Sequence, residues 1–84
     1  MQPSIGNFMT ETTLDLRGLK CPLPALKTRK ALRGLPTGDV LLVETTDPLA
    51  ALDIPNLLRE TGDALEAQDA VDGGLKFRIR KAAP

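Results

Sequence analysis

The chain has 84 residues, and eleven basic side chains balance eleven acidic ones, so the formal net charge at pH 7 is zero. Without net charge no global field attracts nucleic acid or an anionic membrane, and two phenylalanines, the only aromatic residues, leave few rings for stacking on bases. The chain has no histidine, which excludes Ser-His-Asp and Cys-His catalysis, and one cysteine, which excludes an internal disulfide, a CxxC redox pair and a thiolate zinc site. We therefore expect no DNA binding, no metal and no cofactor, and the composition disfavours direct RNA binding.

Targeting signals are not visible in the sequence. No apolar run reaches the length of about 18 residues that a membrane span requires. Residues 1–8 lack the basic and apolar regions of a signal peptide, and with one cysteine this predicts a cytoplasmic protein. Residues 1–11 show no periodicity and are expected to form a flexible tail, followed by a single domain over residues 12–84.

The first two predicted elements flank the cysteine. Apolar and polar residues alternate over residues 13–17, which predicts a half-buried strand that ends at Gly18. Residues 22–33 have helical periodicity, with a proline at the first helical position, so Cys21 is expected to be the N-cap. Gly34 is the expected end of this helix.

The next two elements repeat this layout. Residues 40–43 form an apolar run bounded by turn residues and predict a central strand. Asp47 is the expected N-cap of a helix over residues 48–61, again with proline at the first helical position. Pro55 lies inside this helix and is expected to kink or divide it.

Two more strands complete the chain. Residues 65–71 and 75–80 alternate between apolar and polar side chains, and Asp72-Gly73-Gly74 predicts a tight turn between them. Three of the four strands carry polar residues on one side, so one sheet face must meet water and both helices must cover the other. The prediction is a two-layer α/β sandwich of order β-α-β-α-β-β.

The position of Cys21 favours a chemical role for its sulfur. At a helix N-cap the sulfur would face unpaired backbone N–H groups and the positive end of the helix dipole, and Arg17 and Lys20 lie nearby in the sequence. These groups would favour the nucleophilic thiolate. Without a base or a second thiol, the sulfur is better suited to holding a group covalently and passing it on. The structural alternative is that Cys21 is a small buried residue in the first helical turn.

Residues 14–24 resemble the signature of the TusA (SirA-like) sulfur-carrier family. That signature is a CPxP motif after a D-x-x-G-L strand end, and it takes in the following residues: Gly18, Leu19, Cys21, Pro22 and Pro24. Further motifs of the family follow at Lys30, Pro36-Thr37-Gly38-Asp39, Asp47-Pro48, Asp53-Ile54-Pro55 and Phe77-Arg78-Ile79-Arg80-Lys81. The resemblance thus spans residues 14–81.

The resemblance implies a four-stranded mixed sheet, similar to the C-terminal domain of bacterial translation initiation factor three. It also implies that Cys21 carries sulfane sulfur as a persulfide, as a relay rather than as an enzyme acting on a small substrate. The implied donor is a cysteine desulfurase or a rhodanese-like protein. The implied acceptor is a DsrE-type or other thiol protein, in tRNA thiolation, sulfur oxidation or molybdenum cofactor synthesis.

The sequence departs from the tRNA-pathway members at two places. Those members tend to have Glu between the two prolines and polar residues after the second Asp-Pro, whereas this chain has Leu23 and Ala50-Ala51-Leu52. The surface near the thiol is therefore expected to be more apolar, and this bears on the choice of donor and acceptor.

Other polar residues admit both a structural and a functional interpretation. Asp47 and Asp53 are either local caps or residues that border the thiol and accept a partner's Lys or Arg. Lys27, Lys30 and Arg33 form either a solvated helix face or a docking surface for an acidic partner or RNA.

Two other functions remain open on the sequence alone. A non-catalytic regulatory or RNA-binding module would use the basic faces, including that of Lys76, Arg78 and Arg80 on the last strand. A selenium carrier would use the same thiol and differ only in the atom delivered.

Overall fold

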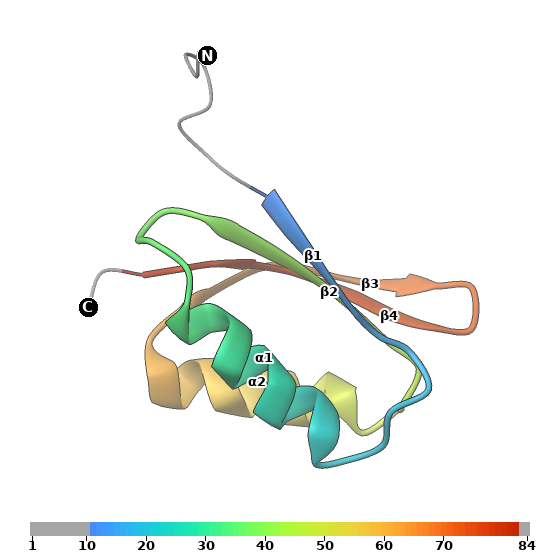
Figure 1. The fold of residues 1–84 in the computed structure, drawn as a ribbon. Helices are drawn as coiled ribbons and strands as arrows, with labels where there is room; N and C mark the ends of the chain where they lie inside the picture. Colours follow the sequence, from blue (N-terminus) through green and yellow to red (C-terminus); the bar gives the residue numbers. More distant parts are fainter. Residues whose placement is uncertain (1–10, 83–84) are drawn as a thin grey trace.

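The computed structural model describes residues 11–82. Its elements follow one another in this order: β1 (Glu11–Leu16), α1 (Leu23–Arg33), β2 (Val40–Thr45), α2 (Ala50–Thr61), β3 (Ala64–Val71) and β4 (Gly74–Arg80) (Figure 1). The predicted β-α-β-α-β-β order is confirmed. β1 begins at Glu11, which the sequence had placed in the tail, and the rest of that expected tail lies outside the described residues.

The four strands form one mixed sheet in the order β1-β2-β4-β3. β1 and β2 are parallel, whereas β4 is antiparallel to both of its neighbours, β2 and β3. Both helices pack on the same face of the sheet, which gives the predicted two layers (Figure 1). In the parallel pair Leu16 lies opposite Thr45, so the loops that leave the two strands start side by side.

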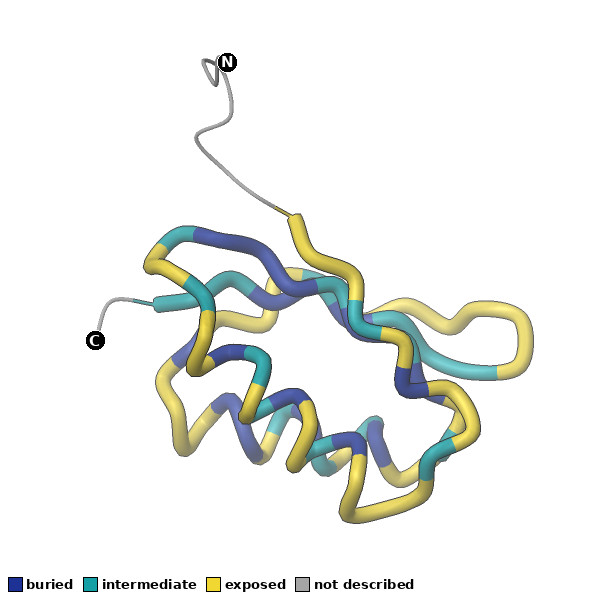
Figure 2. Tube along the Cα trace, viewed as in Figure 1, coloured by how far each residue is buried: buried dark blue, intermediate teal, exposed yellow. Residues whose placement is uncertain are grey.

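The hydrophobic core lies between the sheet and the helices (Figure 2). Phe77 and Ile79 of β4 and Leu41 of β2 are fully buried, and Leu32 of α1 and Ile54 of α2 cover them from the helical layer. Buried side chains recur at every second residue in the strands and at every third or fourth residue in the helices. The sequence therefore predicted both kinds of element from the spacing of its apolar residues.

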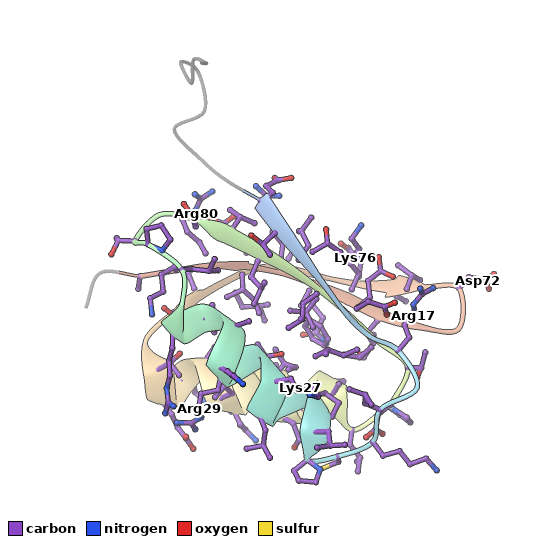
Figure 3. All side chains as sticks on the ribbon, viewed as in Figure 1. Arg17, Lys27, Arg29, Asp72, Lys76 and Arg80 are labelled. Atoms are coloured by element: carbon purple, nitrogen blue, oxygen red, sulfur yellow. The ribbon has the colours of Figure 1, made fainter. Side chains whose placement is uncertain are left out.

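The opposite face of the sheet is charged and internally paired. Arg78 bonds to Glu11 on β1 at 2.7 Å and to Glu66 on β3 at 3.1 Å, and Glu66 also pairs with Arg80. Figure 3 shows Arg80 and Lys76 on the sheet, away from the helices. Most of the basic charge that β4 carries is therefore matched by acidic side chains of its neighbours.

Both helices begin later than predicted. α1 starts at Leu23 with Pro22 as its N-cap, so Cys21 precedes the cap and is not the cap itself. α2 starts at Ala50 after Leu49, so the predicted N-cap, Asp47, stands two residues before the observed one. In both loops the proline belongs to a turn directly before the helix, and its carbonyl accepts an N–H of the first helical turn, that of Leu26 for Pro22 and that of Ala51 for Pro48.

α2 is not divided at Pro55. The helix runs unbroken from Ala50 to Thr61 although Pro55 cannot donate a backbone hydrogen bond. Ile54 and Leu58, on the two sides of the proline, are buried in the core and hold both halves of the helix against the sheet. Within residues 11–82 no helix is long and apolar enough to cross a membrane.

Candidate functional site

Cys21 lies in the loop between β1 and α1, exposed to solvent, beside the loop between β2 and α2. Two hydrogen bonds join the loops. The N–H of Gly18 donates to Thr46 Oγ1 at 2.8 Å, and the N–H of Cys21 donates to Asp47 Oδ2 at 2.6 Å. The structural alternative, in which Cys21 is a small buried residue, is therefore wrong, because Cys21 is exposed in the loop.

The carboxylate of Asp47 accepts hydrogen bonds from the backbone of both loops. Its Oδ2 accepts from Cys21, and its Oδ1 accepts from the N–H of Leu49 at 3.1 Å, in its own loop. Both interpretations of Asp47, as a local backbone acceptor and as a residue that borders the thiol, therefore hold for the same carboxylate. It orders the approach to α2 locally, and it also borders the cysteine.

Asp53 approaches the sulfur itself. It lies in the first turn of α2, and the Cys21 thiol donates a hydrogen bond to Asp53 Oδ2 with an Sγ to Oδ2 distance of 2.9 Å. The two residues are 32 positions apart in the chain. The sequence placed Asp53 near the site, but it could not show that this carboxylate is the hydrogen-bond partner of the thiol.

The surroundings of Cys21 shift the pKa of its thiol upward, whereas the sequence predicted a downward shift. The hydrogen bond to Asp53 raises the pKa of the Cys21 thiol above its ordinary value, and partial desolvation and the charges of Asp53 and Asp47 act in the same direction. The expected activation by the helix N-terminus fails because Cys21 stands outside the cap and makes no capping bond. Arg17 pairs with Asp15 at 2.8 Å instead of facing the sulfur.

A groove between α1 and α2 opens at Cys21. It has a volume of about 240 Å³ and is lined by the following residues: Cys21, Pro22, Ala25, Leu26, Arg29, Asp53, Asn56, Leu57 and Glu60. Arg29, labelled in Figure 3, reaches from α1 to Glu60 on α2 at 2.9 Å. No local sequence pattern predicts this pair, because the two residues lie 31 positions apart in the chain.

Exposed leucines flank the thiol on both helices. Leu23 and Leu26 belong to the start of α1, and Leu26 is 54% exposed. Leu49 and Leu52 belong to the start of α2, and Leu52 is 65% exposed. Of the residues at the two sequence departures, Leu23 and Leu52 are exposed as expected, whereas Ala50 is buried in the core and adds nothing to the surface. Exposed apolar surfaces of this kind mark contacts with other proteins.

The remaining candidate residues fall into two groups. Pro24 and Leu19 serve the fold, since Pro24 is buried and Leu19 packs against the core. Lys27 and Lys30 line a separate hollow between α1 and the β1 edge, away from Cys21, and neither forms an ion pair within residues 11–82. Lys20 lines a crevice between the two loops, and the hydrogen bond of the sulfur goes to Asp53.

No group of three or more acidic, Cys or His side chains that could hold a metal ion occurs in the described part of the chain.

The amino-acid sequence of the chain matches a known protein family. The model of the family described as sulfurtransferase TusA matches residues 12–81. Two putative sulfur carrier proteins of Neisseria meningitidis, from serogroups A and B, are each 46% identical over 65 residues, which is 77% of this chain and 88% of the relative. The sulfur carrier protein TusA of Pseudomonas syringae is 37% identical over 81 residues, which covers 96% of both chains.

Proposed function

The chain belongs to the TusA sulfurtransferase family, and from that premise we propose that it is a sulfur carrier in which Cys21 holds sulfane sulfur as a persulfide. The observation that supports this role is the exposed thiol, which lies at the junction of two loops and lines a groove between α1 and α2. A partner protein can reach this sulfur without any rearrangement of the core.

The transfer is an exchange between sulfur atoms. The Cys21 sulfur attacks the terminal sulfur of a donor persulfide, a new S–S bond forms, and the donor's S–S bond breaks to release the donor thiol. In the second half, an acceptor thiol attacks the terminal sulfur on Cys21 and releases the Cys21 thiol. Neither half consumes an oxidant or a reductant, so one cysteine is sufficient.

The partners are proteins that present a persulfide or a thiol. A cysteine desulfurase or a rhodanese-like protein is the donor, and a DsrE-type or other thiol protein is the acceptor. The exposed leucines near the thiol give such partners an apolar contact surface. Candidate pathways are tRNA thiolation, sulfur oxidation and molybdenum cofactor synthesis.

Intact-mass analysis tests the proposal. The protein is incubated with a cysteine desulfurase and cysteine, and separately with a rhodanese and thiosulfate. We expect the mass of one sulfur atom to be added to the wild type, to map to the Cys21 peptide, and to disappear on treatment with a reductant.

The control is Cys21→Ser, which should unfold at the same temperature as the wild type because residue 21 is exposed. This variant should gain no sulfur. A wild type that stays unloaded with both donors, or a Cys21→Ser variant that still relays labelled sulfur, would contradict the proposal.

An RNA-binding function has less support. Arg78 and Arg80, two of the three cations that would form a basic sheet face, are engaged by Glu11 and Glu66. Paired cations contribute less to phosphate binding, since the acidic partner has to be displaced first.

A further inference from the structure

Asp53 lies in the first turn of α2, and apart from the helix dipole its described partner is a thiol. Within residues 11–82 it forms no ion pair, and its side chain accepts no hydrogen bond from a backbone amide. Its side-chain contact is with the sulfur of Cys21, at 2.9 Å. Of the two interpretations of Asp53, the structure shows no capping hydrogen bond from its side chain, and it shows the carboxylate next to the thiol.

This geometry is that of a thiol and a proton acceptor. A candidate general base must lie within hydrogen-bond reach of the proton it takes, and Asp53 Oδ2 already accepts that proton in a hydrogen bond. The chain has no histidine that could take this role. We propose that Asp53 accepts the Cys21 proton during sulfur transfer, an assignment that rests on the proposed function.

The step balances without a further reactant. As Sγ forms a bond to the terminal sulfur of the donor R–S–SH, the Sγ–H proton passes to Asp53 Oδ2. The donor's S–S bond breaks, and its electron pair goes to the inner sulfur. That sulfur takes the proton from Asp53 and leaves as R–SH. The products are the Cys21 persulfide and the regenerated carboxylate.

The charged groups around the sulfur explain why the thiol needs such an acceptor. Asp53 and Glu60 of α2 and Arg29 of α1 line the groove that holds Cys21. Asp47 of the neighbouring loop accepts the N–H of Cys21, and it lines an adjoining crevice together with Lys20. The two nearest carboxylates raise the pKa of the thiol. The unloaded sulfur is thus held as a protonated thiol, which reacts slowly with stray electrophiles, and it loses its proton to Asp53 when a persulfide is presented.

Asp53→Asn separates this role from a purely electrostatic one. The substitution keeps the shape and removes the charge and the basicity. Alkylation by iodoacetamide depends on the thiolate alone, so it should become faster than in the wild type at pH 7.5. Loading from a donor persulfide should become slower, by about 100-fold, the lower end of what general-base catalysis contributes.

The pH profile gives a second readout. Loading of Asp53→Asn should rise steeply with pH because the solvent must then remove the proton. Loading of the wild type should depend on pH less steeply. Asp53→Glu, which keeps a carboxylate, should recover part of the rate and serves as the test if Asp53→Asn does not fold.

Asp72→Asn is the matched control, since Asp72 is exposed in the β3–β4 turn and makes no contact with Cys21. It removes the same charge and should change neither rate.

Two outcomes would overturn the inference. If alkylation and loading both become faster in Asp53→Asn, the carboxylate only restrains the thiolate. If loading falls but its pH profile keeps the wild-type shape, Asp53 has only a structural role. In either case a wild type that loads sulfur leaves the proposed function standing, whereas a wild type that does not load removes both.

Discussion

Asp47→Ala should loosen the junction that carries the thiol. The wild-type carboxylate accepts the N–H of Cys21 at 2.6 Å and the N–H of Leu49 at 3.1 Å. A hydrogen bond to a charged group contributes about 1.5–3 kcal/mol when it is buried, and solvent at this half-exposed site reduces that contribution. We therefore expect the free energy of unfolding to fall by about 1–2 kcal/mol for the pair of bonds.

Urea denaturation followed by far-UV circular dichroism measures this loss. The slope of free energy against urea should stay the same, because the fold and the buried area do not change. In a domain of this size the melting temperature should fall by about 5–15 °C. Asp47→Asn keeps one acceptor oxygen and should lose about half as much stability.

The reasoning is refuted if Asp47→Ala unfolds within about 0.5 kcal/mol of the wild type. It also fails if Asp47→Asn loses as much as Asp47→Ala, because the loss would then come from the charge and not from the two hydrogen bonds.

Two further predictions concern the strands. Gly74→Ala should lower the free energy of unfolding by about 3 kcal/mol or more, because the added Cβ would lie 2.0 Å from the carbonyl oxygen of Thr45. In Gly73→Ala the added Cβ meets no neighbour, and the loss should be about 1 kcal/mol, because the φ of 78° is unfavourable for alanine. Equal losses of the two variants in urea denaturation would contradict this packing explanation. The hydrogen bond from Arg17 lowers the pKa of Asp15 to about 2, so the contribution of this pair to stability is present above pH 3.8 and is lost as the pH falls through 2. A carboxyl NMR titration should find this midpoint and its return toward 3.8 in Arg17→Ala, and an unchanged midpoint would show that the pair does not form in solution.

The sequence alone was enough to determine the elements and their layers. The alternation in β4 and the spacing of Thr28 and Leu32 in α1 are local patterns, and local periodicity decides which side chains face a core. Cys21 could also be identified as a candidate from the sequence, because it is the one cysteine of the chain and lies between a predicted strand and a predicted helix. The ends of the elements were harder to predict from the sequence. The starts of the helices depend on hydrogen bonds that join the β1–α1 loop to the β2–α2 loop.

The environment of the thiol was decided by the tertiary structure. Parallel pairing of β1 and β2 brings Asp47 to the backbone of Cys21, and the packing of α2 on the sheet brings Asp53 to its sulfur. These contacts join residues 26 and 32 positions apart, and they reverse the direction of the thiol pKa that the local helix-start argument predicts. Electrostatic energy depends on distance in space, and only the folded chain sets the distance between Asp53 and Cys21.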